Sequence, residues 1–112
     1  MKYRGFVQKG AGRGRSLGFP TANIVIKDTV PGGIYAARVT LDNKAYDAAV
    51  YIDTKRKILE ANLLDFSDDL YGKEIEVELL KKIREDEEFH SDEDLHKAIT
   101  EDIQRVRRYF IL

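Results

Sequence analysis

The sequence contains no cysteine and only two histidines, His90 and His96. The absence of cysteine excludes disulfide bonds and thiolate metal sites, and a zinc site built on two histidines would need carboxylates from elsewhere. No run approaches the roughly eighteen apolar residues of a transmembrane helix. Neither sign of charge dominates, because 19 Lys and Arg face 20 Asp and Glu. The net charge of −1 argues against a general nucleic-acid binder. We therefore expect a soluble, cytoplasmic protein.

The chain is short, at 112 residues, but 43% of these are apolar, which is enough for a compact core. Cores rarely split into separate domains below about 250 residues. We expect residues 1–112 to form a single domain.

A glycine-rich stretch occupies residues 10–18, where four glycines and two arginines occur within nine residues. It matches neither the Walker template nor the dinucleotide-binding template. Such a loop can bring backbone N–H groups close to an anion, and Arg13 or Arg15 would add charge-assisted contacts. The alternative is an ordinary hairpin loop, since glycine-rich loops are common.

The residues that follow this stretch are more rigid. Pro20 fixes its own φ and restricts Phe19 to extended geometry. Thr21 and Asn23 are two residues apart, so both side chains leave an extended segment on the same face. Their oxygens are hard ligands of the kind that Mg²⁺ takes beside phosphate groups. The alternative is that Thr21 belongs to a turn that Asn23 caps.

Apolar residues alternate along most of the chain, as is typical of strands. The pattern predicts strands over 2–8, 24–26, 34–41, 46–52 and 58–66, and a last long strand that begins at Ile75. Asp42-Asn43 is a candidate two-residue hairpin turn, because both residue types tolerate positive φ. Six strands in so short a chain predict a mainly β fold, an antiparallel sheet closed into a barrel without free edges.

The fifth predicted strand carries a carboxylate among apolar residues. Leu59, Ala61 and Leu63 share one face, and Glu60, Asn62, Leu64 and Phe66 share the other. Glu60 is therefore a candidate functional acid. The alternative is a residue on the solvated side of the sheet.

The alternation changes to helical spacing after Ser91. Ser91 is a good N-cap, and acidic residues at 92–94 suit the positive end of a helix dipole. Apolar side chains then recur at the spacing of one helical face: Leu95, Ile99, Ile103, Val106 and Phe110. We expect one amphipathic C-terminal helix whose apolar stripe packs on the barrel. The alternative is that one end of this stripe lines a pocket.

Taken together, these residues resemble the riboflavin kinase family over positions 5 to about 102. The pieces that carry the resemblance are 5–10 (GFVQKG), 14–23 (GRSLGFPTAN), 31–36 (PGGIYA), 60–66 (EANLLDF), 70–72 (LYG), 83–84 (IR), 89–91 (FHS) and 95–102. The GFPTAN run is very specific, and the order and spacing of the other pieces make coincidence a poor explanation.

The resemblance implies a six-stranded antiparallel Greek-key β-barrel with a C-terminal α-helix. It implies transfer of the ATP γ-phosphoryl group to the 5′-hydroxyl of riboflavin, giving FMN, with Mg²⁺ as cofactor. The implied partners are riboflavin and ATP, with no nucleic acid or membrane, and the implied state is a monomer. By position it assigns nucleotide binding to Gly10, Gly12, Gly14, Arg15, Gly18, Phe19 and Pro20, the metal to Thr21 and Asn23, catalysis to Glu60, and flavin contacts to Glu60, Arg84 and Asp102.

One segment departs from the family pattern. Residues 51–54 read Tyr-Ile-Asp-Thr where the family has Asn-Ile-Gly and a longer loop with Pro-Thr. This favours a rival interpretation, a flavin- or nucleotide-binding barrel without catalysis. A weaker rival is a nucleic-acid-binding barrel that uses Arg13, Arg15 and the tyrosines, against which the near-zero net charge speaks.

Overall fold

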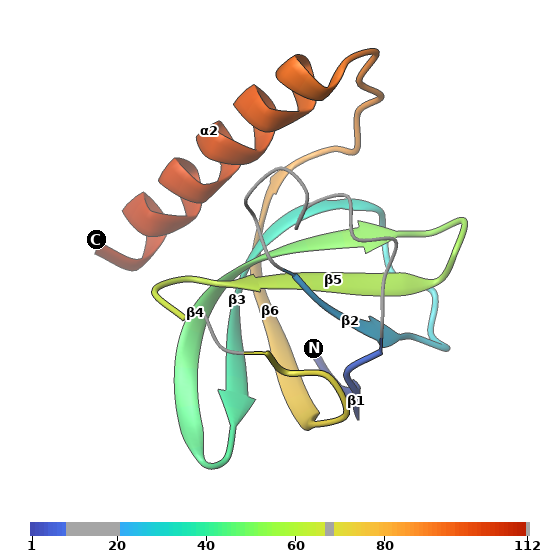
Figure 1. Ribbon diagram of the computed structural model, residues 1–112, viewed down its shortest axis with the longest axis vertical. Coiled ribbons are helices and arrows are strands. Elements are labelled where there is room, and N and C mark those ends of the chain that lie inside the picture. Colours follow the sequence, from blue (N-terminus) through green and yellow to red (C-terminus); the bar gives the residue numbers. More distant parts are fainter. Residues whose placement is uncertain (9–20, 67–68, 112) are drawn as a thin grey trace.

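The structure, a computed structural model, describes residues 1–8, 21–66 and 69–111. Within these residues the chain forms six strands and one helix (Figure 1). The elements are β1 (Lys2–Phe6), β2 (Ala22–Val25), β3 (Gly33–Leu41), β4 (Lys44–Asp53), β5 (Ile58–Leu63), β6 (Glu74–Arg84) and α2 (Asp92–Ile111). No helix in this part of the chain has the length and apolar content needed to cross a membrane.

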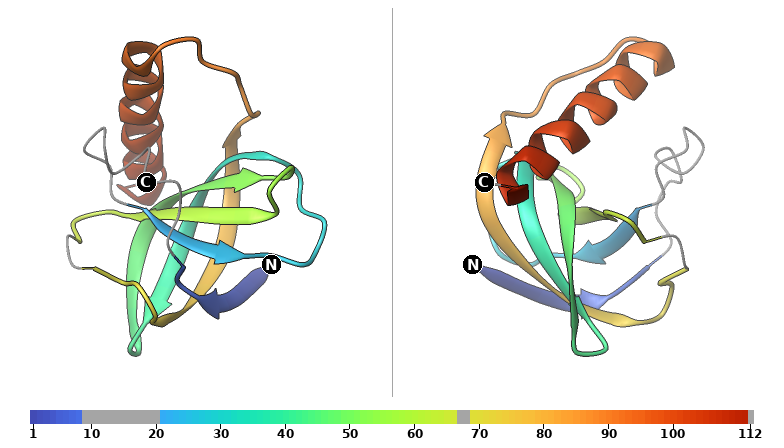
Figure 2. Two further views of the ribbon diagram at one scale, coloured as in Figure 1. Left: turned by 45° about the vertical axis from the view of Figure 1, so that its right-hand side comes forward. Right: turned by 90° about the vertical axis from the view of Figure 1, so that its left-hand side faces the viewer.

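The strands form one antiparallel sheet in the order β1-β6-β3-β4-β5-β2. Strands β3, β4 and β5 follow one another as neighbours, and β6 returns beside β3, which is a Greek-key arrangement. The sheet curls into a nearly closed barrel (Figures 1 and 2). Its two edges meet at an isolated bridge, where the Gln8 N–H donates to the Asn23 carbonyl at 2.7 Å. The predicted antiparallel barrel with a C-terminal helix is confirmed, although its closure is incomplete.

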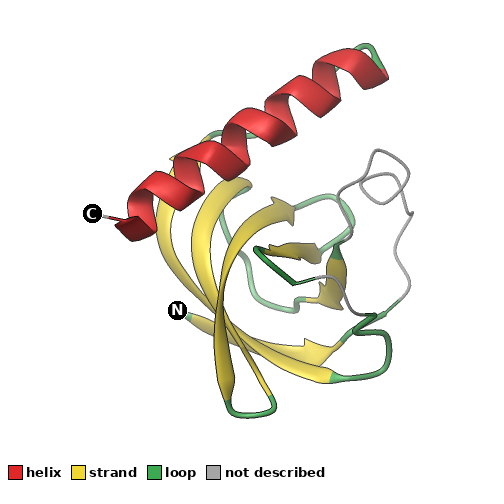
Figure 3. Cartoon of the chain, turned by 60° about the vertical axis from the view of Figure 1, so that its left-hand side comes forward, coloured by secondary structure: helices red, strands yellow, loops and turns green. Residues whose placement is uncertain are grey.

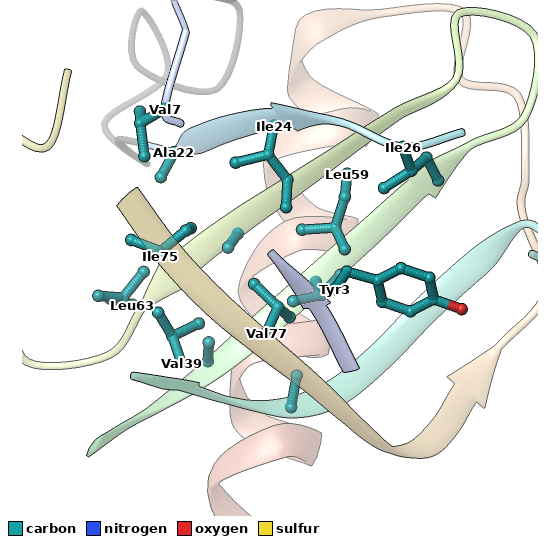
Figure 4. Close-up of a cluster of buried hydrophobic side chains, with 14 of the residues drawn as sticks. Tyr3, Val7, Ala22, Ile24, Ile26, Val39, Leu59, Leu63, Ile75 and Val77 are labelled. Carbon is teal, nitrogen blue, oxygen red and sulfur yellow. The ribbon is translucent and has the colours of Figure 1, made fainter. Parts of the chain in front are cut away.

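The barrel interior is filled by every second side chain of the strands, as the alternation predicts (Figure 4). Its largest fully buried members are Ile24, Val39, Val50, Ile52, Leu59, Ile75 and Val77. The turn between β3 and β4 also agrees with the prediction, because Asp42 and Asn43 have φ values of 51° and 66°.

Helix α2 begins as predicted, with the Asp94 N–H donating to Ser91 Oγ at 3.1 Å. The helix lies outside the barrel and contacts β3, β4 and β6 (Figures 2 and 3). Its second half makes the main apolar contact, because Val106 is fully buried against Ala36 of β3 and Leu64.

Two strands end at least two residues earlier than predicted. Strand β1 stops at Phe6, and β5 stops at Leu63 because the chain turns at Asp65, which has a φ of 60°. The turn separates two side chains that were expected to share a face. Leu64 packs beneath α2, whereas Phe66 packs against the barrel core with its ring 5.0 Å from that of Tyr46.

Position 33, the first residue of β3, requires glycine. Its φ is 139°, and a Cβ atom there would lie 2.5 Å from the carbonyl oxygen of Arg84. The close approach of β3 to the end of β6 therefore depends on the missing side chain.

We expect Gly33→Ala to lower the free energy of unfolding by about 3 kcal/mol, because the new Cβ adds a backbone clash to an unfavourable φ. Gly72→Ala is the matched control, since Gly72 has a φ of 82° and no atom lies within 4 Å of an added Cβ. It should cost only about 1 kcal/mol. Urea unfolding followed by circular dichroism measures both, and equal losses would contradict the argument.

Candidate active site

The sheet register brings residues far apart in sequence into one row. Asn23 of β2 lies opposite Glu60 of β5, and Glu60 lies opposite Tyr51 of β4. The row continues from Tyr51 to Ile34 of β3 and from Ile34 to Arg84 of β6. The neighbours of Asn23, Glu60 and Tyr51 along each strand point into the core, so these three side chains leave on the outer face of the barrel.

A pocket of about 460 Å³ lies on this outer face. Its polar lining includes Thr21, Asn23, Arg56, Glu60 and Asn62, and further on Tyr51, Arg84, Asp86, Glu87 and Asp102. Its apolar lining includes Ile34, Ala49, Phe89, Leu95, Ile99 and Ile103. The size is that of a small-molecule site, and apolar walls with a few convergent polar groups are typical of such sites.

The candidate acid Glu60 is partly buried and held by one neighbour. The Nη2 atom of Arg56 donates to Oε1 of Glu60 at 3.1 Å. No residue of the described part of the chain donates to its other oxygen, Oε2. Burial raises the pKa of Glu60, and the positive charge of Arg56 opposes this rise without cancelling it. Within the described residues, the side chain is thus a carboxylate with a raised pKa and with hydrogen bonding at one oxygen only.

The amide of Asn23 has an unsatisfied oxygen. Asn23 is 6% exposed, and its Oδ1 atom finds no hydrogen-bond donor among the described residues. A buried acceptor without a partner is costly, so such an atom is a candidate ligand contact. Thr21, which directly precedes β2, lines the same pocket. A hydroxyl and an amide oxygen are suitable ligands for Mg²⁺. The remaining coordination positions of the ion would suit phosphate oxygens and water.

Residues 1–8, 21–66 and 69–111 contain no cluster of acidic or histidine side chains that would form another metal site. No group of three or more histidine, aspartate or glutamate side chains there could hold a metal ion.

Arg84 and Asp102 both line the pocket, where they bind each other. Arg84 donates from Nε and Nη2 to the two carboxylate oxygens of Asp102, each at 2.8 Å, and from Nη1 to the Glu85 carbonyl at 3.0 Å. The hydrogen bonds to Asp102 raise the pKa of Arg84. The guanidinium also lies 5.6 Å from the ring centre of Phe89. This bidentate pair fastens α2 to the end of β6 at the pocket wall.

Tyr51 connects the sheet to the segment before α2. Its hydroxyl donates to Oδ2 of Asp86 at 3.2 Å. Burial, followed by the nearby charge of Asp86, raises the pKa of Tyr51 to about 12. The phenol therefore remains a neutral donor at physiological pH.

The structure brings together Thr21, Asn23, Glu60, Arg84 and Asp102, which the sequence singled out, around a single pocket. The predicted nucleotide-binding residues Gly10, Gly12, Gly14, Arg15, Gly18, Phe19 and Pro20 lie outside the described residues.

Sequence reasoning missed several pocket residues. Arg56 belonged to a charged connection with no evident partner, and Asp86 to an acidic run interpreted as a solvated turn. Leu95 and Ile99 belong to the helix stripe that was assigned to the core, with the alternative that one end lines a pocket, and both line the pocket.

Comparisons with known proteins show what the chain is similar to. The family model described as riboflavin kinase matches residues 1–110. The bifunctional riboflavin kinase/FMN adenylyltransferase of Bacillus subtilis is 33% identical over 96% of this chain and 38% of its own length. The chain spans half or less of the first curated relatives that it matches.

Two solved structures are similar in fold and sequence. One, described as a macrolide-efflux protein from Streptococcus pneumoniae, has a TM-score of 0.84 and 32% identity over 95% of this chain and 38% of that one. The riboflavin kinase of Trypanosoma brucei has a TM-score of 0.70 and 26% identity over 96% of this chain and 75% of that one.

We expect Asp102→Ala to lower the free energy of unfolding by about 3 kcal/mol, because it leaves the largely buried Arg84 guanidinium without its partner. Asp65→Asn is the control, because asparagine tolerates the φ of 60° at this position. It weakens a two-bond pair with Arg107, but the Asp65 side chain is 79% exposed, so its loss should be much smaller than that of Asp102→Ala. Thermal and urea unfolding compare the two variants, and a loss for Asp102→Ala no larger than that for Asp65→Asn would refute the assignment.

Proposed function

The chain belongs to the riboflavin kinase family, and we propose that it transfers the γ-phosphoryl group of ATP to the 5′-hydroxyl of riboflavin, producing FMN. The observation that carries the proposal is the shared pocket of Thr21, Asn23 and Glu60, which continues into an apolar space beneath α2. Riboflavin likewise has a polar part and an apolar part, because it joins a polar ribityl chain to a flat, largely apolar ring system. We propose riboflavin and ATP as partners of this site and the cytoplasm as its location.

The apolar half of the pocket would take the flavin ring. Ile34 and Ala49 offer a wall on the sheet, and Leu95 and Ile99 offer a facing wall on α2. Burying an apolar ring between them supplies binding free energy that requires no charged contact. The pair of Arg84 and Asp102 holds the helix wall at its distance from the sheet.

Glu60 would then act as the general base. As the 5′-oxygen forms its bond to the γ-phosphorus, the bond from that phosphorus to the β–γ bridging oxygen breaks, and the hydroxyl proton passes to Glu60. The Oε2 atom, which accepts no hydrogen bond from the described residues, would take this proton, and the raised pKa of the carboxyl increases its basicity. A positioned base typically contributes about 10²–10⁴-fold to the rate.

Thr21 and Asn23 would hold Mg²⁺ through the hydroxyl and the Oδ1 atom. A bound Mg²⁺ supplies positive charge to the phosphate groups of the nucleotide, which phosphoryl transfer requires. The buried Oδ1 of Asn23, without a donor among the described residues, supports this role. We assign the nucleotide contacts to Gly10, Gly12, Gly14, Arg15, Gly18, Phe19 and Pro20 from their match to the family pattern, and the backbone N–H groups of a glycine-rich stretch suit phosphate groups.

The rival function, flavin binding without catalysis, rests on the altered residues 51–54. The structure disfavours it, because Tyr51 lies beside Glu60 in the sheet and leaves the acid in the pocket with Thr21 and Asn23.

The direct test incubates the chain with riboflavin, ATP and Mg²⁺ and measures FMN by chromatography. The wild-type chain should form FMN. Glu60→Gln should lower kcat by at least about 10²-fold because the base is lost, and binding to this variant should still quench the fluorescence of riboflavin. Glu78→Gln, which changes an acid outside the pocket, should keep the wild-type kcat. Flavin binding without any FMN from the wild-type chain would establish the rival function.

A separate prediction concerns the metal. Asn23→Ala should raise the KM for Mg²⁺-ATP by about tenfold or more and leave riboflavin binding nearly unchanged, because only the metal contact is removed. Excess Mg²⁺ should recover part of the loss. If Asn23→Ala weakens riboflavin as much as Mg²⁺-ATP, Asn23 serves the shape of the pocket and not the metal.

A further inference from the structure

The turn between β4 and β5 is built around one carboxylate. Asp53 Oδ1 accepts the backbone N–H groups of Lys55 and Arg56, at 3.0 and 3.1 Å. Its Oδ2 atom accepts Nε of Arg56 at 2.7 Å. Asp53 therefore fixes the turn and, with its second oxygen, the orientation of the Arg56 guanidinium.

The same guanidinium reaches the candidate base. While Nε is bound to Asp53, Nη2 donates to Glu60 Oε1 at 3.1 Å. Arg56 lines the pocket and is about half exposed, whereas the side chains of Asp53 and Glu60 are 15% and 23% exposed. Two partly buried carboxylates thus hold one arginine between them.

The contact restrains Glu60 in a useful way. A carboxylate on a strand can rotate about its terminal torsion, since such torsions have broad energy wells. A hydrogen bond to Oε1 limits that rotation and leaves Oε2 for the substrate. A charge-assisted bond from a planar guanidinium is well suited to this, because Arg56 presents several donors in a fixed plane.

We propose that Arg56 is a positioning residue for Glu60, and that Asp53 orients Arg56 in turn. The inference rests on the proposed kinase function, in which Glu60 takes the proton of the substrate hydroxyl. It assigns a task to Asp53, which belongs to the segment 51–54 that departs from the family pattern, and to Arg56, which follows that segment. Arg56 acts through Glu60, so its loss should appear in the rate of the chemical step and not in substrate binding.

Arg56→Ala tests this first. We expect kcat to fall by about 10- to 100-fold, as is typical when an outer-shell partner of a functional group is removed. The KM values for riboflavin and ATP should stay within about twofold of the wild-type values. Arg56→Lys should retain an intermediate rate, and added guanidinium should restore part of the activity of Arg56→Ala. Arg107→Ala, which removes an arginine paired with Asp65 instead of Glu60, should leave kcat unchanged.

A double variant separates positioning from independent roles. If Arg56 acts through Glu60, then Glu60→Gln combined with Arg56→Ala should be no slower than Glu60→Gln alone. Asp53→Asn should lower kcat several-fold, with no further loss when it is added to Arg56→Ala.

Three outcomes decide the inference. Wild-type chain that forms no FMN overturns the proposed function and the inference with it. In an active wild type, an unchanged kcat for Arg56→Ala shows that the contact is an ordinary surface ion pair and overturns the inference alone. Independent losses in the double variant show that Arg56 does not act through Glu60 and overturn the inference. A rise confined to the KM for ATP after Arg56→Ala shows that Arg56 contacts the nucleotide, and it also overturns the inference.

Discussion

Antiparallel register across β2, β5 and β4 is the constraint on which the site depends. Ile24 and Leu59 face the core, so their neighbours Asn23 and Glu60 must face outward, opposite one another. A slip of one residue would bury the acid in the barrel and expose apolar side chains, which the hydrophobic core resists. The free energy that fills the barrel therefore also fixes the candidate metal ligand beside the candidate base.

Helix α2 serves two purposes along its length. Val106 in its second half packs against Ala36 and Leu64, which anchors the helix on the barrel. Its first half carries Leu95 and Ile99 over the pocket. Between the two halves, Asp102 binds Arg84 and fixes the helix to β6. One amphipathic face thus supplies both a packed contact and the apolar wall of a ligand site.

Local patterns predicted most of the fold, because alternation and capping are set by neighbouring residues. The hairpin at Asp42-Asn43 and the N-cap at Ser91 needed no tertiary information. Glu60 could be found as an acid in an apolar strand. Arg56 could not, because it lies in a turn beside lysines, and its bonds to Asp53 and Glu60 depend on how that turn folds. The pairing of Arg84 with Asp102 joins residues on two elements, and the sequence pattern showed only that both were of interest.

The most direct measurement of the central claim is a crystal structure of the chain with riboflavin, Mg²⁺ and a non-hydrolysable ATP analogue. The account predicts the ribityl 5′-oxygen within about 3 Å of the Glu60 carboxylate. It also predicts the metal ion on the oxygens of Thr21 and Asn23, and the flavin ring between the sheet and α2. A flavin bound elsewhere, or a 5′-oxygen turned away from Glu60 with the metal on other residues, would contradict it.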